Sequence, residues 1–214
     1  MSKRIKLYLG LIIFIIAVFL AFPQDSYAVF IFGDGLLGHF NGDFTYSAAD
    51  TRLTITLTNT SPAANGGFIV GFSFNNPSNL ISSVVALNTS DPDFGVAGGP
   101  GYNNSVGESP FGQFDIGAEI SGSPLQGIGV GATETFVFNF TGTNLNTLNE
   151  SIFLSTLSSP HGDGEGVQPF VVRFQGFEDG DSDKVPLVPE PTTMLLFGIG
   201  ALGLGINKFK KERR

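Results

Sequence analysis

Hydrophobic and polar side chains alternate along much of the chain between residues 29 and 184. In Arg52–Asn59, for example, Leu53, Ile55 and Leu57 alternate with an arginine and threonines. Alternation with a period of two is typical of a strand that faces a core on one side and solvent on the other. The same pattern predicts strands over 40–47, 68–75, 81–88, 111–120, 134–142 and 170–177.

The segments between these expected strands are rich in glycine, proline, asparagine and serine, which favour turns. Seven to nine short strands over this length predict an all-β domain, an antiparallel, jelly-roll-like β-sandwich over residues 29–184. In residues 147–157, Thr147 and Glu150 fit a capping box, which predicts a short helix. The glycine-rich stretch Gly95–Gly112 predicts a long exposed loop, where surface function is often found.

The N-terminal segment predicts export. Residues 1–28 comprise a basic start, an apolar run and a polar break that ends in Ser26 and Ala28. Small residues at these two positions, −3 and −1, are typical of a signal peptidase site. We therefore expect 1–28 to be a signal peptide and Val29 to begin the mature chain. The alternative is an uncleaved anchor, because the apolar run is close to the shortest length that spans a membrane.

The C-terminal segment predicts a second contact with the membrane. Thr192–Ile206 carries no charge and would form a helix about 22 Å long, against a hydrocarbon core of about 30 Å. We expect residues 192–207 to be a short transmembrane helix and the basic tail 208–214 to stay in the cytoplasm. The cations of the tail are Lys208, Lys210, Lys211, Arg213 and Arg214.

The expected linker, residues 185–191, contains the sequence Val188, Pro189, Glu190 and Pro191. Followed by a glycine-rich apolar segment with LGLG and by the basic KFKKERR, it resembles the PEP-CTERM sorting signal of Gram-negative bacteria. The resemblance implies recognition by an exosortase, a membrane-embedded cysteine transpeptidase-like enzyme that removes the tail. Proline fits such a motif physically, because it stops the helix and leaves the motif extended.

The resemblance also implies a location and a setting. The protein would lie transiently in the inner membrane, after signal peptidase has acted, and then at the cell surface or in the extracellular matrix. Such proteins are typically associated with exopolysaccharide, biofilm or floc formation. The signal implies that the chain is the substrate of an enzyme, and it carries no information on the activity of residues 29–184.

Charge and cysteine content exclude several classes of function. Between Val29 and Pro191, three cations stand against seventeen carboxylates, a net charge of −14. This net negative charge repels the phosphates of nucleic acid, so we expect no nucleic-acid partner. The chain has no cysteine, which excludes disulfides and thiolate metal sites. The domain must therefore be held by its core, for which 17 of the chain's 22 phenylalanines are present between residues 29 and 184.

Acidic turns are the candidate metal sites. Asp179, Asp181 and Asp183 alternate as at the start of a calcium loop, but Lys184 stands where that loop needs glycine. We therefore expect a solvated acidic linker, no cofactor, and at most weak calcium binding. The other oxygen-rich turns contain Asp91 and Asp93, and His161, Asp163 and Glu165.

Enzymatic activity is not expected. The chain has no G-x-S-x-G elbow, and it lacks tryptophan, the commonest stacking platform of a sugar-cleaving cleft. Our first hypothesis is an exported surface or extracellular-matrix protein, structural or adhesive in exopolysaccharide or biofilm. The alternative is a carbohydrate-binding module for extracellular polysaccharide, and the least favoured is an extracellular hydrolase. An exposed aromatic row beside carboxylates in a concave face would favour the carbohydrate-binding module.

Overall fold

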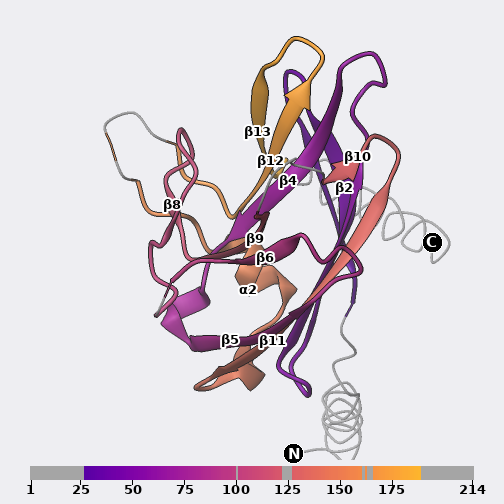
Figure 1. Ribbon diagram of the computed structural model, residues 1–214. Helices are drawn as coiled ribbons and strands as arrows, with labels where there is room; N and C mark the ends of the chain where they lie inside the picture. The colour runs from indigo at the N-terminus through magenta and orange to yellow at the C-terminus, as the bar shows by residue number, and fades with distance from the viewer. Residues whose placement is uncertain (1–26, 100, 122–126, 161, 163–165, 189–214) are drawn as a thin grey trace, which may run out of the picture.

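The structure, a computed structural model, describes residues 27–99, 101–121, 127–160, 162 and 166–188. Within these ranges the chain forms two antiparallel sheets that enclose one hydrophobic core (Figure 1). The prediction of an all-β, antiparallel fold is confirmed, and the jelly-roll-like strand order stays a prediction. The expected signal peptide and transmembrane helix lie outside the described ranges. Among the helices inside them, none is long and apolar enough to cross a membrane.

Sheet A has the strand order β1–β2–β3–β11–β5. Its strands are β1 (Val29–Asp34), β2 (His39–Ser47), β3 (Arg52–Asn59), β11 (Thr133–Gly142) and β5 (Ile81–Asn88). The first three follow one another as hairpins, whereas β11 enters between β3 and β5 from a distant part of the chain. Alternation decides which side of each strand is buried: Phe136, Phe138 and Phe140 face the core, and the intervening residues face outward.

Sheet B has the strand order β13–β12–β4–β9–β6, and β10 pairs with β4. Its strands are β13 (Ser182–Pro186), β12 (Phe170–Phe177), β4 (Gly66–Phe74), β9 (Ile116–Ile120), β6 (Phe94–Ala97) and β10 (Ile128–Gly129). The predicted strand 111–120 is divided, because Asp115 separates β9 from the short β8 (Gln113–Phe114). β8 pairs with β7 (Val106–Gly107) in a small hairpin.

The glycine-rich stretch Gly95–Gly112 is not simply an exposed loop. It contains β7, and residues of the β7–β8 hairpin pack against the outer side of sheet B in a second apolar cluster. That cluster consists of Ala97, Val106, Phe114 and Val171, with Phe111 beside it. The apolar residues of the hairpin are thus buried, and the hairpin is held against the sandwich.

Helical structure in the described ranges is short: α2 (Glu150–Ser155) and the single turns η1 (Pro77–Asn79) and η2 (Leu145–Thr147). The helix predicted near residue 150 is present, but the capping box is not. Asn149 is the N-cap, and its side-chain oxygen accepts a hydrogen bond from the Ile152 amide at 3.0 Å. The Glu150 carboxylate instead accepts from the Tyr46 amide at 2.7 Å, so it fastens α2 to β2.

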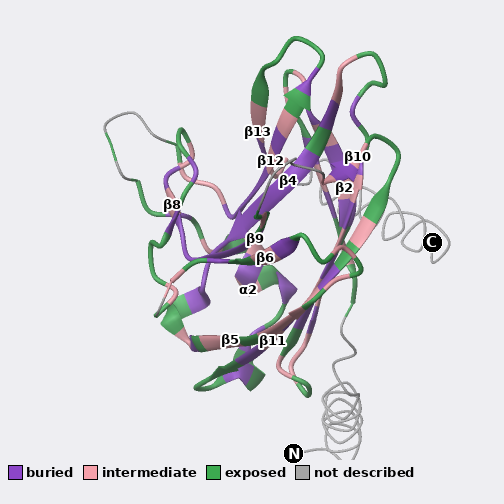
Figure 2. Cartoon of the chain, in the orientation of Figure 1, coloured by how far each residue is buried: buried purple, intermediate pink, exposed green. Residues whose placement is uncertain are grey.

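Phenylalanine rings from both sheets form the centre of the core. Phe72 of β4 lies 4.8 Å from Phe136 and 6.0 Å from Phe138, ring centroid to ring centroid. Phe74 lies 5.3 Å from Phe138, and Phe153 of α2 covers the open end of this stack. Figure 2 shows the result: the strand faces that look between the sheets are buried, and exposed residues concentrate in turns and on the outer sides.

The sandwich continues past the expected domain end at residue 184. β13 runs to Pro186, the Leu187 amide donates to the Phe170 carbonyl at 3.0 Å, and the Val188 amide donates to the Phe32 carbonyl at 2.9 Å. The expected linker therefore begins four residues too early. The reason is that these backbone groups find partners on β12 and β1, which the local sequence does not indicate.

Tyr46 generates a prediction on pH. Its hydroxyl donates to the Leu145 carbonyl at 2.9 Å, and burial raises its pKa from 10 to about 12. The unfolded chain loses this proton near pH 10, whereas the folded protein keeps it. Below pH 10 the hydroxyl is protonated in both states, so Tyr46 makes its full contribution to the free energy of unfolding. As pH rises from 10 to 12, we expect the free energy of unfolding to fall by up to about 3 kcal/mol.

Urea unfolding of the exported protein at pH 9, 10, 11 and 12 measures this decline. Tyr46→Phe should be less stable at pH 9, where it lacks the hydrogen bond to Leu145, and its decline above pH 10 should be shallower. Equal slopes for the two proteins above pH 10 would contradict the assignment.

Candidate functional site

The outer face of sheet A carries two rows of side chains that run across four strands. Successive residues of one strand alternate between the two faces, so residues directly opposite each other on neighbouring strands share a face. The register aligns one row as Phe32, Asn41, Thr58 and Thr133. It aligns the other row as Phe30, Asp43, Thr56 and Thr135. Each row therefore passes from an aromatic ring through an amide or a carboxylate to two hydroxyls.

The aromatic end of these rows lies on β1, at the edge of the sheet. The rings of Phe30 and Phe32 are 6.1 Å apart between centroids and 26° from parallel, and 53% of Phe30 is exposed. Beside them is an open hollow of about 450 Å³, whose lining includes Asp34, His39 and Thr60. An exposed phenylalanine is unusual on a face that is otherwise polar, and it marks a candidate contact surface.

Asp34 and His39 contact each other in the lining of the hollow. His39 Nδ1 lies 2.7 Å from Asp34 Oδ1, across the turn that joins β1 to β2. This contact fixes the two side chains against each other beside the aromatic rings.

The hydroxyl end of the rows is organised by threonine pairs. Thr58 Oγ1 lies 2.7 Å from Thr133 Oγ1, and Thr56 Oγ1 lies 3.1 Å from Thr135 Oγ1. One hydroxyl of each pair donates to the other, so each pair retains one free O–H and several free lone pairs. The pairs thus present hydrogen-bonding groups at fixed positions on the outer face of sheet A.

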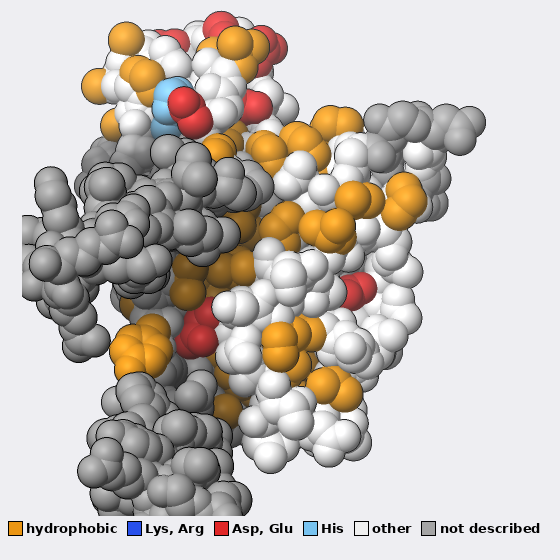
Figure 3. Space-filling view, turned by 180° about the vertical axis from the view of Figure 1, so that it is seen from behind, with side chains coloured by type: hydrophobic (Ala, Val, Ile, Leu, Met, Phe, Trp, Pro, Cys, Tyr) orange, Lys and Arg blue, Asp and Glu red, His pale blue; other side chains and the backbone are white. Residues whose placement is uncertain are grey.

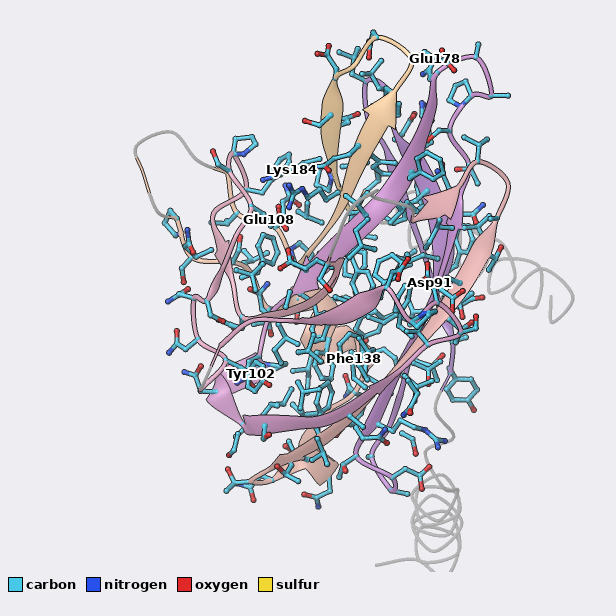
Figure 4. The ribbon with its side chains drawn as sticks, viewed as in Figure 1. Asp91, Tyr102, Glu108, Phe138, Glu178 and Lys184 are labelled. Atoms are coloured by element: carbon cyan, nitrogen blue, oxygen red, sulfur yellow. The ribbon has the colours of Figure 1, made fainter. Side chains whose placement is uncertain are left out.

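A second candidate lies on the outer side of sheet B, where Glu108 of the β7–β8 hairpin meets Lys184 of β13 (Figure 4). Lys184 Nζ is 2.9 Å from Glu108 Oε2, and the Ser73 hydroxyl donates to Glu108 Oε1 at 3.1 Å. The Glu108 side chain is only 7% exposed. Oε2 has no well-aligned hydrogen bond, so the ionic attraction of Lys184 is its compensation.

A second cation, Arg173, lies next to this pair. Arg173 stands directly opposite Lys184 in the register of β12 and β13, and it forms no ion pair within the part of the chain that the structure describes. An open hollow of about 360 Å³ lies beside Lys184, lined also by Ser109, Pro110, Phe111, Ser182 and Asp183. Glu108 neutralises one of the two cations, so we interpret the pair as a clamp that holds the hairpin on the sheet.

The structure separates the three candidate calcium ligands. Asp183 Oδ2 accepts from the amides of Leu37 and Gly38 at 2.9 and 3.0 Å, so it fastens the β1–β2 turn to β13. Asp179 Oδ1 accepts from the Asp181 amide at 3.0 Å within the β12–β13 turn. Among the described residues, no group of three His, Cys, Asp or Glu side chains is placed to hold a metal ion. Weak calcium binding stays a prediction.

The other predicted positions lie near or outside the described ranges. Val188 is paired with β1, whereas Pro189, Glu190, Pro191 and the basic tail lie beyond the described residues, as does Ser26. Ala28 is exposed, and the first strand begins at Val29. The turn residues Asp91 and Asp93 bond to each other locally, since Asp91 Oδ1 accepts from the Asp93 amide at 3.0 Å.

Sequence reasoning missed both structural candidates. Phe30 and Phe32 lie in the continuous apolar run Val29–Phe32, in which the alternation that reveals an outer face is absent. Glu108 and Lys184 are 76 positions apart, so only the folded chain brings them together. A usable signal was present, however: Lys184 is one of only three cations between Val29 and Pro191.

Comparison with known proteins and families gives one match to the sequence of this chain. The family model described as the PEP-CTERM protein-sorting motif matches residues 187–211. No curated protein and no solved structure is significantly similar to the chain.

The chain thus carries a PEP-CTERM sorting motif, as the resemblance in its sequence implied. This motif identifies an exported protein that transits the membrane of a Gram-negative bacterium and is processed by an exosortase. The first two matched residues, Leu187 and Val188, are hydrogen-bonded to the sandwich, so the motif follows the folded domain directly.

The clamp between Glu108 and Lys184 can be tested by the loss of stability when one partner is removed. Lys184→Met leaves the Glu108 carboxylate buried without a counter-charge, and we expect it to lower the free energy of unfolding by about 3 kcal/mol. The double variant with Glu108→Gln should recover most of this loss, because no buried charge remains. Urea unfolding of the exported protein measures both.

Arg173→Met is the matched control, since it removes a neighbouring cation that has no ion-pair partner among the described residues. We expect it to cost less than about 1 kcal/mol. If Lys184→Met were as mild as this control, Glu108 would not depend on Lys184.

Proposed function

We propose that the protein is a surface or extracellular-matrix component with an adhesive or structural role in exopolysaccharide or biofilm. The observation that carries the proposal is the outer face of sheet A, with its two rows of aromatic, amide, carboxylate and hydroxyl groups across four strands. Such a face can contact an extended polymer across several strands at once. Small substrates are instead bound in concave pockets that bury most of their surface.

The carbohydrate-binding alternative is a more specific form of this role. Its support is the exposed ring of Phe30 and its neighbour Phe32, which line the open hollow together with Asp34 and lie in register with Asp43 and Asn41. Both the adhesive and the carbohydrate-binding hypotheses use the same face of the sandwich.

A hydrolase receives less support. Glycoside hydrolysis requires two carboxyl groups on either side of the scissile bond. Of the two hollows described above, one is lined by the single carboxylate of Asp34 and the other by that of Asp183, which is already bonded to two backbone amides. We therefore do not propose an enzymatic activity.

Processing provides the first test. Replacing Pro189, Glu190 and Pro191 with alanine lets the helix extend back through the motif and removes the charge that an exosortase could read. We expect the variant to remain in the membrane fraction as a longer species, with most of the surface protein lost. Fractionation and intact-mass measurement check this outcome.

Glu178→Ala is the control for that experiment. It removes one acidic charge from the exposed β12–β13 turn and leaves the motif unchanged, so processing should proceed as in the unaltered protein. If the triple variant were released with the unaltered mass, the motif would not direct sorting.

The start of the mature chain is the second test. We expect Val29 at the N-terminus of the exported protein, because Ala28 is exposed and β1 begins immediately after it. N-terminal sequencing measures this directly. Ala28→Arg should block cleavage at this bond, whereas recovery of Met1 from the unaltered protein would show that the segment is retained.

A further inference from the structure

We infer that the outer face of β1, β2, β3 and β11 binds a neutral polysaccharide, with the chain lying across the strands along the two rows. The inference rests on the proposed adhesive role and gives it a partner and a site. The rows extend over four strands, a distance of about 14 Å, which is long enough for several sugar rings. The two rows are about 7 Å apart along the strands.

The aromatic end suits the apolar face of a sugar ring. The rings of Phe30 and Phe32 are inclined by 26° and stacked, and the exposed ring of Phe30 can receive the apolar face of a sugar ring. More than half of Phe30 is exposed, although the adjacent Ile31 is buried in the core. Phe30 thus exposes apolar surface to water, and a sugar ring that covers it recovers the free energy of that burial.

The polar part of the rows suits the hydroxyl groups of the same ligand. Asn41 and Asp43 follow the aromatic rings, and neither side chain has a hydrogen-bond partner among the residues that the structure describes. The amide offers both a donor and an acceptor, and the carboxylate accepts. Beyond them, each threonine pair retains a free O–H, so donors and acceptors continue to the far end of both rows.

Charge selects a neutral chain over an acidic one. The carboxylates beside the rings are those of Asp34 and Asp43, and neither row contains a lysine or arginine. Arg52, the cation of β3, is paired with Asp50 at 3.2 Å. In the view of Figure 3, several carboxylates and a histidine are visible among the described side chains. A polyuronate or an anionic lipid surface would therefore be repelled.

Affinity electrophoresis of the exported, processed protein tests the inference. Native gels would contain one of two neutral glucans, hydroxyethyl cellulose or dextran, or the acidic alginate. We expect at least one neutral glucan to retard the protein and alginate to leave its mobility unchanged. Phe30→Ala should raise the apparent dissociation constant about tenfold, a change in affinity of the size that one well-placed aromatic ring provides.

Phe68→Ala is the matched control, because Phe68 is a 37% exposed phenylalanine on β4 of the opposite sheet. It removes the same group and should leave binding to the glucan unchanged. An unchanged melting temperature of the Phe30→Ala protein separates loss of contact from loss of fold, since Phe30 is not in the core.

Three results would overturn the inference: no retardation by either neutral glucan, retardation by alginate alone, or equal binding by the Phe30→Ala and Phe68→Ala proteins. None of these results bears on processing at residues 189–191. Normal fractionation together with unaltered glucan binding by the Phe30→Ala protein would therefore reject the outer face of sheet A as the binding site. The proposed surface role would stand. Failure of the fractionation test would reject the sorting route independently.

Discussion

The packing of Phe72 against Phe136 and Phe138 joins the two sheets, and the remaining features of the structure depend on it. No disulfide is possible in this chain, so the two layers are held by apolar contact and by hydrogen bonds such as those that Asp183 accepts from the Leu37 and Gly38 amides. The T-shaped geometry of these ring pairs, with centroids 4.8 and 6.0 Å apart, is the arrangement that aromatic pairs prefer. Because the inner faces hold the phenylalanines in place, the outer faces are free to carry groups that contribute little to stability.

The open edges of the two sheets are protected in different ways. An unpaired edge strand is a template for association with another chain. β1 receives the hydrogen bond of Val188, and β5 carries two irregularities in its pairing with β11, opposite Asn139–Phe140 and Thr141–Gly142. Bulges bend a strand and disturb its unpaired edge. At the edge of sheet B, β6 is only four residues long. These features limit association with another chain through the edges of the sheets.

Much of the fold could be predicted from the sequence, because one face of most strands is polar. The predicted strands Arg52–Asn59, Ile81–Asn88 and Phe170–Phe177 agree with β3, β5 and β12 residue for residue. Where the pattern was not periodic, prediction failed: the apolar run Val29–Phe32 gave no sign of a strand with an outer face. The short strands β6, β7, β8 and β10 depend on pairing with distant partners, and no local pattern specifies them.

The candidate sites were less predictable, since they are assembled by register. Phe30 and Thr135 belong to the same row only because β2 and β3 lie between β1 and β11 in a particular alignment. Asp183 has a role that spacing along the chain does not indicate. It alternates with Asp179 and Asp181 as at the start of a calcium loop, and in the fold it accepts hydrogen bonds from two backbone amides. The sorting motif was predictable because it is a linear sequence pattern.

The attachment of the last two described residues has a mechanical consequence. Tension on the C-terminal side of Val188 reaches the sandwich through the hydrogen bonds Val188–Phe32 and Leu187–Phe170, at the very end of β13. Because these bonds lie one after the other along the chain, they are loaded in sequence and open one at a time. The outermost strand would therefore peel away under load before the phenylalanine core is disturbed. Such an edge yields a few residues of extra length under a pull and closes again when the tension ends.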